Sequence, residues 1–262
     1  MDMMELIRTR KSVRTFDGNA VTENDIKKLT EYIETITNPF GVPVGFVLLD
    51  ANEHSLSSPV IQGEHLYIAG KVPKTEHCAE AFGYSFEKMV LYAWSLGIGT
   101  TWIGGTMKRE QFEKEAGVRE GEIMPCISPL GYPAKKRSIK EIGMRTAIRA
   151  DKRIKSEELF FEKDLGTPLR CDDVTVRNAL EAVRLAPSAV NKQPWRIVKC
   201  GNDYHFYEKH TLASGGAAWD VQKVDVGIAM CHFMSIAGGT LSFEKPETAV
   251  GKDTEYIATV TL

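Results

Sequence analysis

The stretch APSAVNKQPW at residues 186–195 places three neutral hydrogen-bonding side chains, Ser188, Asn191 and Gln193, just after a predicted helix. Prolines on both sides restrict the backbone of this loop. The two amides offer both donors and acceptors, which suits a planar heterocycle whose edge alternates C=O and N–H groups. A turn that caps the helix and binds no ligand explains the same residues equally well.

Helices and strands recur in the same order before and after a charged, weakly patterned arm at 138–173. The first set is predicted as helices at 25–36, 77–96 and 107–116 and strands at 44–50, 65–72 and 123–130. The second set is predicted as helices at 173–186 and 221–237 and strands at 193–198, 203–209 and 255–262. A short helix is expected around 157–161, inside the arm. The pattern indicates an α+β fold.

The recurrence can be followed by register. Val21-Thr22 recurs as Val174-Thr175 at an offset of 153 (174 minus 21). The same offset aligns the apolar face of the helix at 25–36 with that of the helix at 173–186. The helix ends SLGIGT and SIAGGT align at an offset of 140 (235 minus 95), so the second copy has shorter loops. We interpret this as a duplication, with halves at 1–150 and 151–262. The alternative is that the same order of helices and strands recurs by chance within a single α+β chain.

Composition limits the classes of function. The chain has 262 residues, of which 43% are hydrophobic, enough for a substantial core. Its 33 basic and 35 acidic residues nearly balance, so we expect no nucleic-acid partner and no anionic membrane surface. The five cysteines show no metal-ligand spacing and are expected to be reduced thiols. With no apolar run long enough for a membrane span, we expect a cytoplasmic protein.

The basic segment RTRKSVRTF at 8–16 brings Arg10, Lys11, Ser12 and Arg14 close together in sequence. Forked guanidinium donors, an ammonium and a hydroxyl in one loop suit a phosphate. A solvated basic surface without a ligand is the simpler alternative.

Two further segments are candidates for the same ligand. PLGYPAKKR at 129–137 delivers Lys135, Lys136 and Arg137 just after a predicted buried strand, where a phosphate could use them. LGIGTTWIGG at 96–105 contains glycines that allow a ligand to approach the backbone closely, although it lacks the spacing of the known nucleotide fingerprints. A polar loop and a tight turn, respectively, are the alternatives.

These four motifs together resemble the nitroreductase family of FMN-dependent oxidoreductases. RKSVRTF resembles the family's N-terminal phosphate and flavin motif, and APSAVNKQPW resembles its Pro-Ser-x-x-Asn-x-Gln-Pro-Trp motif. GIGTTWIGG is similar to its central glycine segment and LGYPAKKR to its C-terminal phosphate-binding end. The resemblance implies an α+β fold with a central, mainly antiparallel sheet flanked by helices, and FMN bound across a two-subunit interface.

The order of the motifs departs from that family. There the Pro-Ser motif precedes the glycine segment, whereas here it follows LGYPAKKR, and TNPFGVPVGF at the expected position keeps only Asn38. A duplication explains this order, because the second half then supplies the loop that a partner subunit would supply. TPLRCDD at 167–173 has only Arg170 in place of a second basic motif. The chain therefore resembles a fused, monomeric pseudo-dimer with one intact site.

The resemblance also assigns roles to individual residues. Arg10, Ser12 and Arg137 would hold the FMN phosphate, with Lys11 and Lys135 or Lys136 nearby, and Arg14 would face the pyrimidine end of the flavin. The ring would be lined by Pro187, Ser188, Ala189, Asn191 and Gln193 on one side and by the backbone of Ile103, Gly104 and Gly105 on the other. No catalytic side chain and no metal are expected.

The activity implied by the resemblance is hydride transfer from NADH or NADPH, through FMN, to a nitroaromatic, a quinone or a similar planar acceptor. Two alternatives stay open. One is a flavin-binding protein without turnover, used for storage or sensing. The other is a flavoenzyme of the same fold with another reaction, such as dehalogenation.

Overall fold

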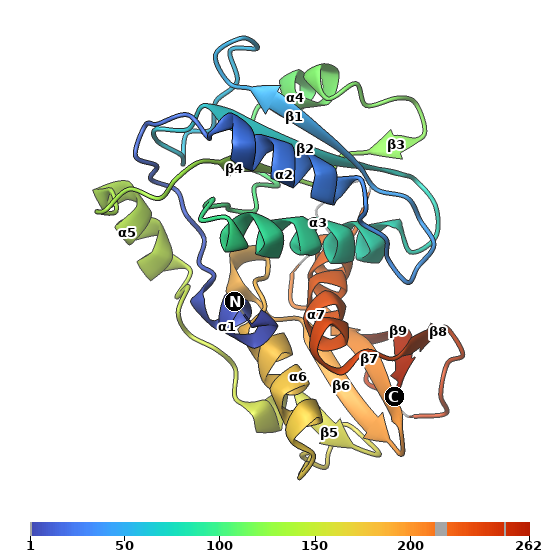
Figure 1. Ribbon diagram of the computed structural model, residues 1–262. Helices are drawn as coiled ribbons and strands as arrows, with labels where there is room; N and C mark the ends of the chain where they lie inside the picture. The colour runs from blue at the N-terminus through green and yellow to red at the C-terminus, as the bar shows by residue number, and fades with distance from the viewer. Residues whose placement is uncertain (1, 213–218, 249) are drawn as a thin grey trace.

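The computed structural model describes residues 2–212, 219–248 and 250–262, whose strands form two sheets (Figure 1). The first sheet pairs β1 (Gly45–Asp50) with β2 (Leu66–Pro73), and β2 also pairs with the short strands β3 (Glu122–Ile123) and β4 (Ile127–Leu130). All of these pairings are antiparallel.

The second sheet has the order β5-β6-β7-β9-β8. Its strands are β5 (Phe160–Glu162), β6 (Trp195–Cys200), β7 (Asp203–Lys209), β8 (Thr240–Ser242) and β9 (Thr254–Thr261). Only β5 and β6 run parallel; the other pairings are antiparallel. The expected α+β class with mainly antiparallel pairing is confirmed, with the strands divided between two sheets.

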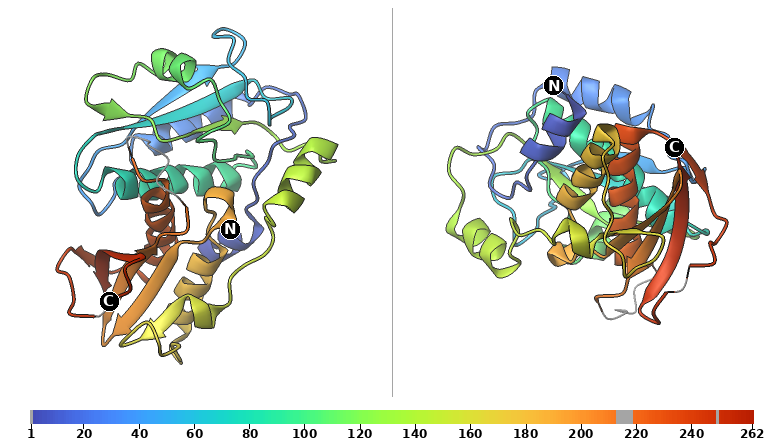
Figure 2. Two further views of the ribbon diagram at one scale, coloured as in Figure 1. Left: turned by 180° about the vertical axis from the view of Figure 1, so that it is seen from behind. Right: turned by 90° about the horizontal axis from the view of Figure 1, so that it is seen from below.

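Two long, largely buried helices lie between the sheets (Figure 1). One helix, α3 (Cys78–Ser95), packs against β2, and the other, α7 (Val221–Ala237), packs against β7. The helices α6 (Val174–Leu185) and α1 (Met3–Thr9) contact each other beside α7 (Figure 2). Helix α1 precedes the first sheet in sequence, yet it contacts α6 and α7, which follow that sheet. The N-terminal helix therefore packs against helices from the C-terminal part of the chain.

The crossing of α3 and α7 depends on two glycines. A Cβ atom on Gly83 would lie 2.0 Å from the carbonyl oxygen of Val224, and one on Gly227 would lie 2.1 Å from that of Glu80. The two glycines are 144 residues apart in sequence (227 minus 83). The two residues whose carbonyl oxygens they approach, Glu80 and Val224, are also 144 residues apart (224 minus 80). Each helix therefore presents equivalent positions to the other, which is the relation that a two-fold axis produces in a dimer.

The remaining helices surround this centre. They are α2 (Glu23–Ile33), α4 (Arg109–Glu115) and α5 (Ile139–Ala147), with the short 3-10 turns η1 (Ser156–Glu158) and η2 (Ala189–Asn191). The side chains of Thr22, Ser138 and Asp173 cap α2, α5 and α6 by accepting hydrogen bonds from backbone N–H groups in the first turn. No helix of the described residues is long and apolar enough to cross a membrane.

The arm differs from its sequence-based description. The short helix expected around 157–161 is correct only in its first part: the 3-10 helix η1 ends at Glu158, and β5 follows, because Phe160 and Phe161 pair with β6 as an edge strand. A further helix, α5, occupies residues that looked weakly patterned. The expected strand at 123–130 is split into β3 and β4 around Pro125, which has no N–H for a sheet hydrogen bond.

Candidate functional site

Two of the basic segments converge on one pocket. A pocket of about 570 Å³ lies between them, lined by Lys11 and Ser12 from the first segment and by Lys135, Lys136 and Arg137 from the second. These residues are more than 120 positions apart in sequence. The structure therefore brings together most of the residues that were predicted to hold a phosphate.

Backbone pairing explains this convergence. Val13 N donates to Thr100 O (2.8 Å), and Ala134 N donates to Thr15 O (3.0 Å), so the N-terminal segment runs between the glycine segment and the end of β4. Glycines permit the close packing: a Cβ on Gly99 would lie 2.7 Å from a methyl carbon of Val13. Gly99 therefore serves the packing of the N-terminal segment.

A buried carboxylate closes one side of this pocket. Glu141, on α5, is 3% exposed, and its Oε2 accepts hydrogen bonds from the hydroxyl of Thr15 (2.9 Å) and from the backbone N–H of Arg14 (3.3 Å). Its Oε1 lies 3.4 Å from Nε of Arg137. The carboxylate of Glu141 thus contacts an arginine, a hydroxyl and a backbone N–H, which are the same kinds of donor that bind phosphate.

Arginines with unused donors gather next to this pocket. Arg10 Nε and Nη1, Arg14 Nη1 and Arg153 Nε are buried, and none donates a hydrogen bond to the described part of the chain. Burial, followed by the proximity of Arg10 and Arg184, lowers the pKa of Arg153 to about 10. Burial also lowers the pKa of Arg14, against the opposing effect of Glu141. Buried cations with unused donors favour the binding of an anion.

Arg153 was missed in the sequence analysis because it lies in the arm. Its Nη1 donates to the side-chain oxygen of Asn191 (3.3 Å), and its Nη2 donates to the carbonyl of Leu185 (3.2 Å). A second pocket, of about 280 Å³, shares Arg137 with the first and is also lined by Arg145, Arg149 and Lys152. The arm therefore extends the basic surface from the first pocket toward the loop at 186–195.

Arg10 points toward a buried polar network that joins α3 and α7. Its Nε lies 3.7 Å from Oε1 of Glu87, and both side chains are at most 5% exposed. Glu87, on α3, also accepts from Nε1 of Trp102 (3.1 Å) and lies 2.9 Å from Nε2 of His232 on α7. The contact from Arg10 is longer than a hydrogen bond, so its Nε and Nη1 both keep unused donors.

The polar side chains of the loop at 186–195 bind the arm. Asn191 Nδ2 donates to the carbonyls of Arg149 (2.7 Å) and Lys152 (2.8 Å), and Gln193 Oε1 accepts from the backbone N–H of Ile154 (2.8 Å). Within the loop, Ser188 Oγ accepts from the N–H of Gln193 (2.8 Å). These hydrogen bonds are those of the turn-forming alternative, and they hold the arm in place.

The loop is also conformationally unusual. Val190, Asn191 and Gln193 have positive φ angles of 43°, 59° and 50°, which non-glycine residues rarely adopt. The backbone N–H of Ala189 donates to both carboxylate oxygens of Asp225 on α7 (3.0 and 3.1 Å). Backbone strain held by surrounding bonds is common where a loop has a function.

The predicted contacts from the glycine segment lie elsewhere. Ile103 is buried, whereas Gly104 and Gly105 are exposed, and none of the three lines either basic pocket. The carbonyl of Gly104 accepts from Arg109 (2.6 Å), whose guanidinium lies 4.7 Å from the ring of Trp219 in the second half. The structure thus assembles the phosphate candidates, but it does not bring the ring candidates into the same pocket.

Residues 2–237 match the family model described as "Putative TM nitroreductase". The chain belongs to this family. The crystal structure of a "putative nitroreductase" from Thermotoga maritima is 20% identical, has a TM-score of 0.63 and aligns over 100% of this chain and 94% of that chain. This likeness shows that the nitroreductase-family chain has the nitroreductase fold. No protein with a curated function matches it.

Two further solved structures cover about half of this nitroreductase-family chain. A nitroreductase family protein from Clostridium novyi is 17% identical, with a TM-score of 0.45, and covers 54% of this chain and 91% of that chain. An FMN-dependent nitroreductase from Clostridium difficile is 17% identical, with a TM-score of 0.44, and covers 51% of this chain and 88% of that chain.

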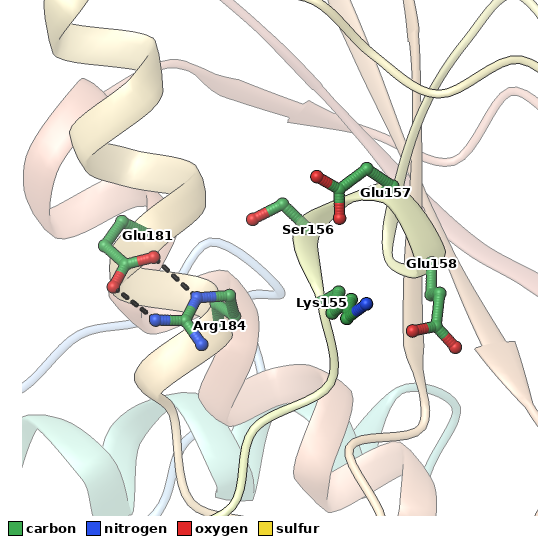
Figure 3. A pocket seen from close by; sticks show the side chains of 6 residues that line it. All are labelled: Lys155, Ser156, Glu157, Glu158, Glu181 and Arg184. Carbon is green, nitrogen blue, oxygen red and sulfur yellow. Dashed lines mark hydrogen bonds and ion pairs between the residues drawn. The ribbon is translucent and has the colours of Figure 1, made fainter.

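A wider pocket, of about 750 Å³, lies between α6 and η1 and holds none of the predicted site residues (Figure 3). It is lined by Lys155, Ser156, Glu157, Glu158, Glu181 and Arg184. The guanidinium of Arg184 donates to both carboxylate oxygens of Glu181 (2.6 and 2.7 Å), so its charge is balanced within the pocket. The basic pocket between Ser12 and Arg137 is therefore the better candidate for the functional site of this nitroreductase-family chain.

Proposed function

We propose that the protein is an FMN-dependent oxidoreductase that uses NADH or NADPH to reduce a nitroaromatic, a quinone or a similar planar acceptor. The observation that carries this proposal is the convergence of Lys11, Ser12, Lys135 and Arg137 on one pocket. Membership of the nitroreductase family supports the oxidoreductase class. The Clostridium difficile relative is described as FMN-dependent.

The residues of the pocket fit the phosphate of FMN. A phosphate monoester carries close to two negative charges and accepts several hydrogen bonds. Ser12 offers a hydroxyl, Lys11 and Lys135 offer ammonium groups, and Arg137 is 44% exposed beside them. The buried nitrogens of Arg10 and Arg14 without hydrogen bonds are further donors close to this segment. In this proposal, these side chains bind the phosphate end.

The ring end of the cofactor would lie toward the second half. We propose that Arg14 faces its pyrimidine end. The ring would then extend out of the basic pocket, between Pro187, Ser188 and Ala189 on one side and the backbone of Gly104 and Gly105 on the other. FMN supplies the hydride chemistry when bound, so this chain needs no nucleophile or general base of its own. A cation at the pyrimidine end would stabilise negative charge there. Asn191 and Gln193 would act mainly by holding the arm and its arginines beside the site.

We also propose that the chain is a monomeric pseudo-dimer with halves at 1–150 and 151–262. The reciprocal contacts of Gly83 and Gly227 support this proposal. In it, the second half supplies the loop that a partner subunit would supply. Arg170 occupies the position of the second basic motif and is exposed, so we expect one intact site per chain.

The proposal is tested by FMN binding to the wild type and two arginine variants. Arg137→Ala should weaken FMN binding by about 1.5–3 kcal/mol, roughly 10- to 150-fold, because one charge-assisted hydrogen bond is lost. Arg170→Ala is the matched control and should leave the affinity unchanged. Flavin fluorescence quenching measures both. A protein that takes up no FMN, or an Arg137 variant with unchanged affinity, contradicts the proposed site.

Turnover is tested separately, by adding NADH and NADPH anaerobically to the FMN-loaded protein and following the visible spectrum. Bleaching by either donor supports the oxidoreductase. A yellow protein that neither donor bleaches would favour the flavin-binding protein without turnover.

A further inference from the structure

A second group of chemically reactive side chains lies in the second half, where β7 ends and α7 begins. Glu208 is the residue before the last one of β7, His210 follows that strand, and Asp220 is the N-cap of α7. One ligand atom from each of the three residues lies within 4.8 Å of the other two. None of them lines the basic pockets described above.

Glu208 is a buried carboxyl group without a hydrogen-bond partner among the described residues. Its side chain is fully buried, and neither carboxylate oxygen accepts a hydrogen bond from the residues that the structure describes. The nearest cationic candidate is Nδ1 of His210, 3.0 Å from Oε1, in a geometry that is not that of a hydrogen bond. A buried carboxylate without partners costs several kcal/mol, so a proton or a cation is expected there.

The surrounding charges do not supply that cation. Asp220, Glu255, His210 and Lys223 are the charged groups that act on Glu208. The ammonium of Lys223 lies 2.8 Å from Oε1 of Glu255 and is therefore already paired. Nε2 of His210 is 3.8 Å from the other oxygen of Glu255. Among these four groups in the described part of the chain, His210 is the one that contacts Glu208 directly, at 3.0 Å.

We propose that Glu208, His210 and Asp220 bind a divalent transition-metal ion such as Zn²⁺. Two carboxylates and one imidazole form a donor set that suits Zn²⁺ and leaves a fourth position for water. The N–H of Gln222 donates to Oδ1 of Asp220 (2.8 Å), which leaves Oδ2 available as a ligand. The proposal is independent of the flavin.

The ion would stabilise the connection between β7 and α7. It would link the two elements directly, next to the hydrogen bonds from the N–H groups of Thr211 and Leu212 to Oε1 of Gln222. Asp225, one turn further along α7, holds the N–H of Ala189 in the strained loop. A metal that fixes the first turn of α7 would therefore also support this loop.

The test uses the full chain, freed of metal with EDTA and titrated with CoCl₂ and then ZnCl₂. Co²⁺ with nitrogen and oxygen ligands gives visible absorption bands, so binding is seen directly. We expect one Co²⁺ per chain, its displacement by Zn²⁺, and a higher melting temperature with either ion.

Substitutions identify the ligands. Glu208→Gln and Asp220→Asn should each weaken Co²⁺ binding by more than about 30-fold. Glu115→Gln is the matched control, because Glu115 contacts His54 at 2.8 Å without belonging to this cluster, and it should leave the affinity unchanged. If Glu208→Gln does not fold, the Asp220 variant decides. A wild type that binds no Co²⁺, or that binds it equally well without Asp220 or Glu208, overturns the proposal.

Discussion

Gly83→Ala perturbs the close contact between α3 and α7. The added Cβ would lie 2.0 Å from the carbonyl oxygen of Val224, and real Cβ contacts essentially never fall below 3.0 Å, so the helices must separate by about 1.0 Å (3.0 minus 2.0). The obstacle is backbone, which cannot rotate away as a side chain can. We therefore expect a loss at the upper end of overpacking costs, about 3 kcal/mol or more of unfolding free energy.

The matched control for this substitution is Gly143→Ala. Gly143 also lies inside a helix, α5, but a Cβ there would meet nothing within 4 Å. Alanine should stabilise that helix by about 0.5–1 kcal/mol. Urea unfolding followed by circular dichroism gives both values. If Gly83→Ala and Gly143→Ala have the same stability, the close crossing of α3 and α7 is not part of the folded protein.

Two further predictions concern the candidate site. Glu141→Gln removes a negative charge from the wall of the basic pocket and should tighten FMN binding by about 1 kcal/mol, roughly fivefold, in a fluorescence titration; weaker binding would mean that Glu141 orders the pocket instead. Burial raises the pKa of Asp225 well above its usual value, so folding favours its protonated form. The stability of the wild type should therefore fall relative to Asp225→Asn as the pH rises above about 4 in unfolding experiments; a constant difference would refute this.

Local patterns predicted most of the fold. Helix α7 and strand β7 were predicted with the bounds that the structure shows, because a long apolar helix and a β-branched or aromatic run are encoded locally. Strand β5 was not, because it forms only beside β6. Helix α5 was missed because Ile139 is 89% exposed and the helix has no buried apolar face that a periodic pattern could reveal. The helix ends aligned at an offset of 140, whereas the crossing relates positions 144 apart, about one helical turn further.

Which residues line the candidate pocket could be predicted in part for the same reason. The basic motifs carry their donors in short local runs, so Ser12 and Arg137 could be named from sequence. Glu141 and Arg153 could not, because only the tertiary path of the arm brings Glu141 to the pocket and Arg153 to the loop at 186–195. The amides of Asn191 and Gln193 can bind a heterocycle or a backbone equally well, and composition alone does not decide which partner they have.

The central claim is that one chain, with two related halves, builds one flavin site. It is tested most directly by titrating the purified protein with FMN and measuring its mass by light scattering. The account predicts saturation near one FMN per chain at the mass of a monomer. No uptake of FMN, two FMN per chain, or binding only by a dimer would contradict it.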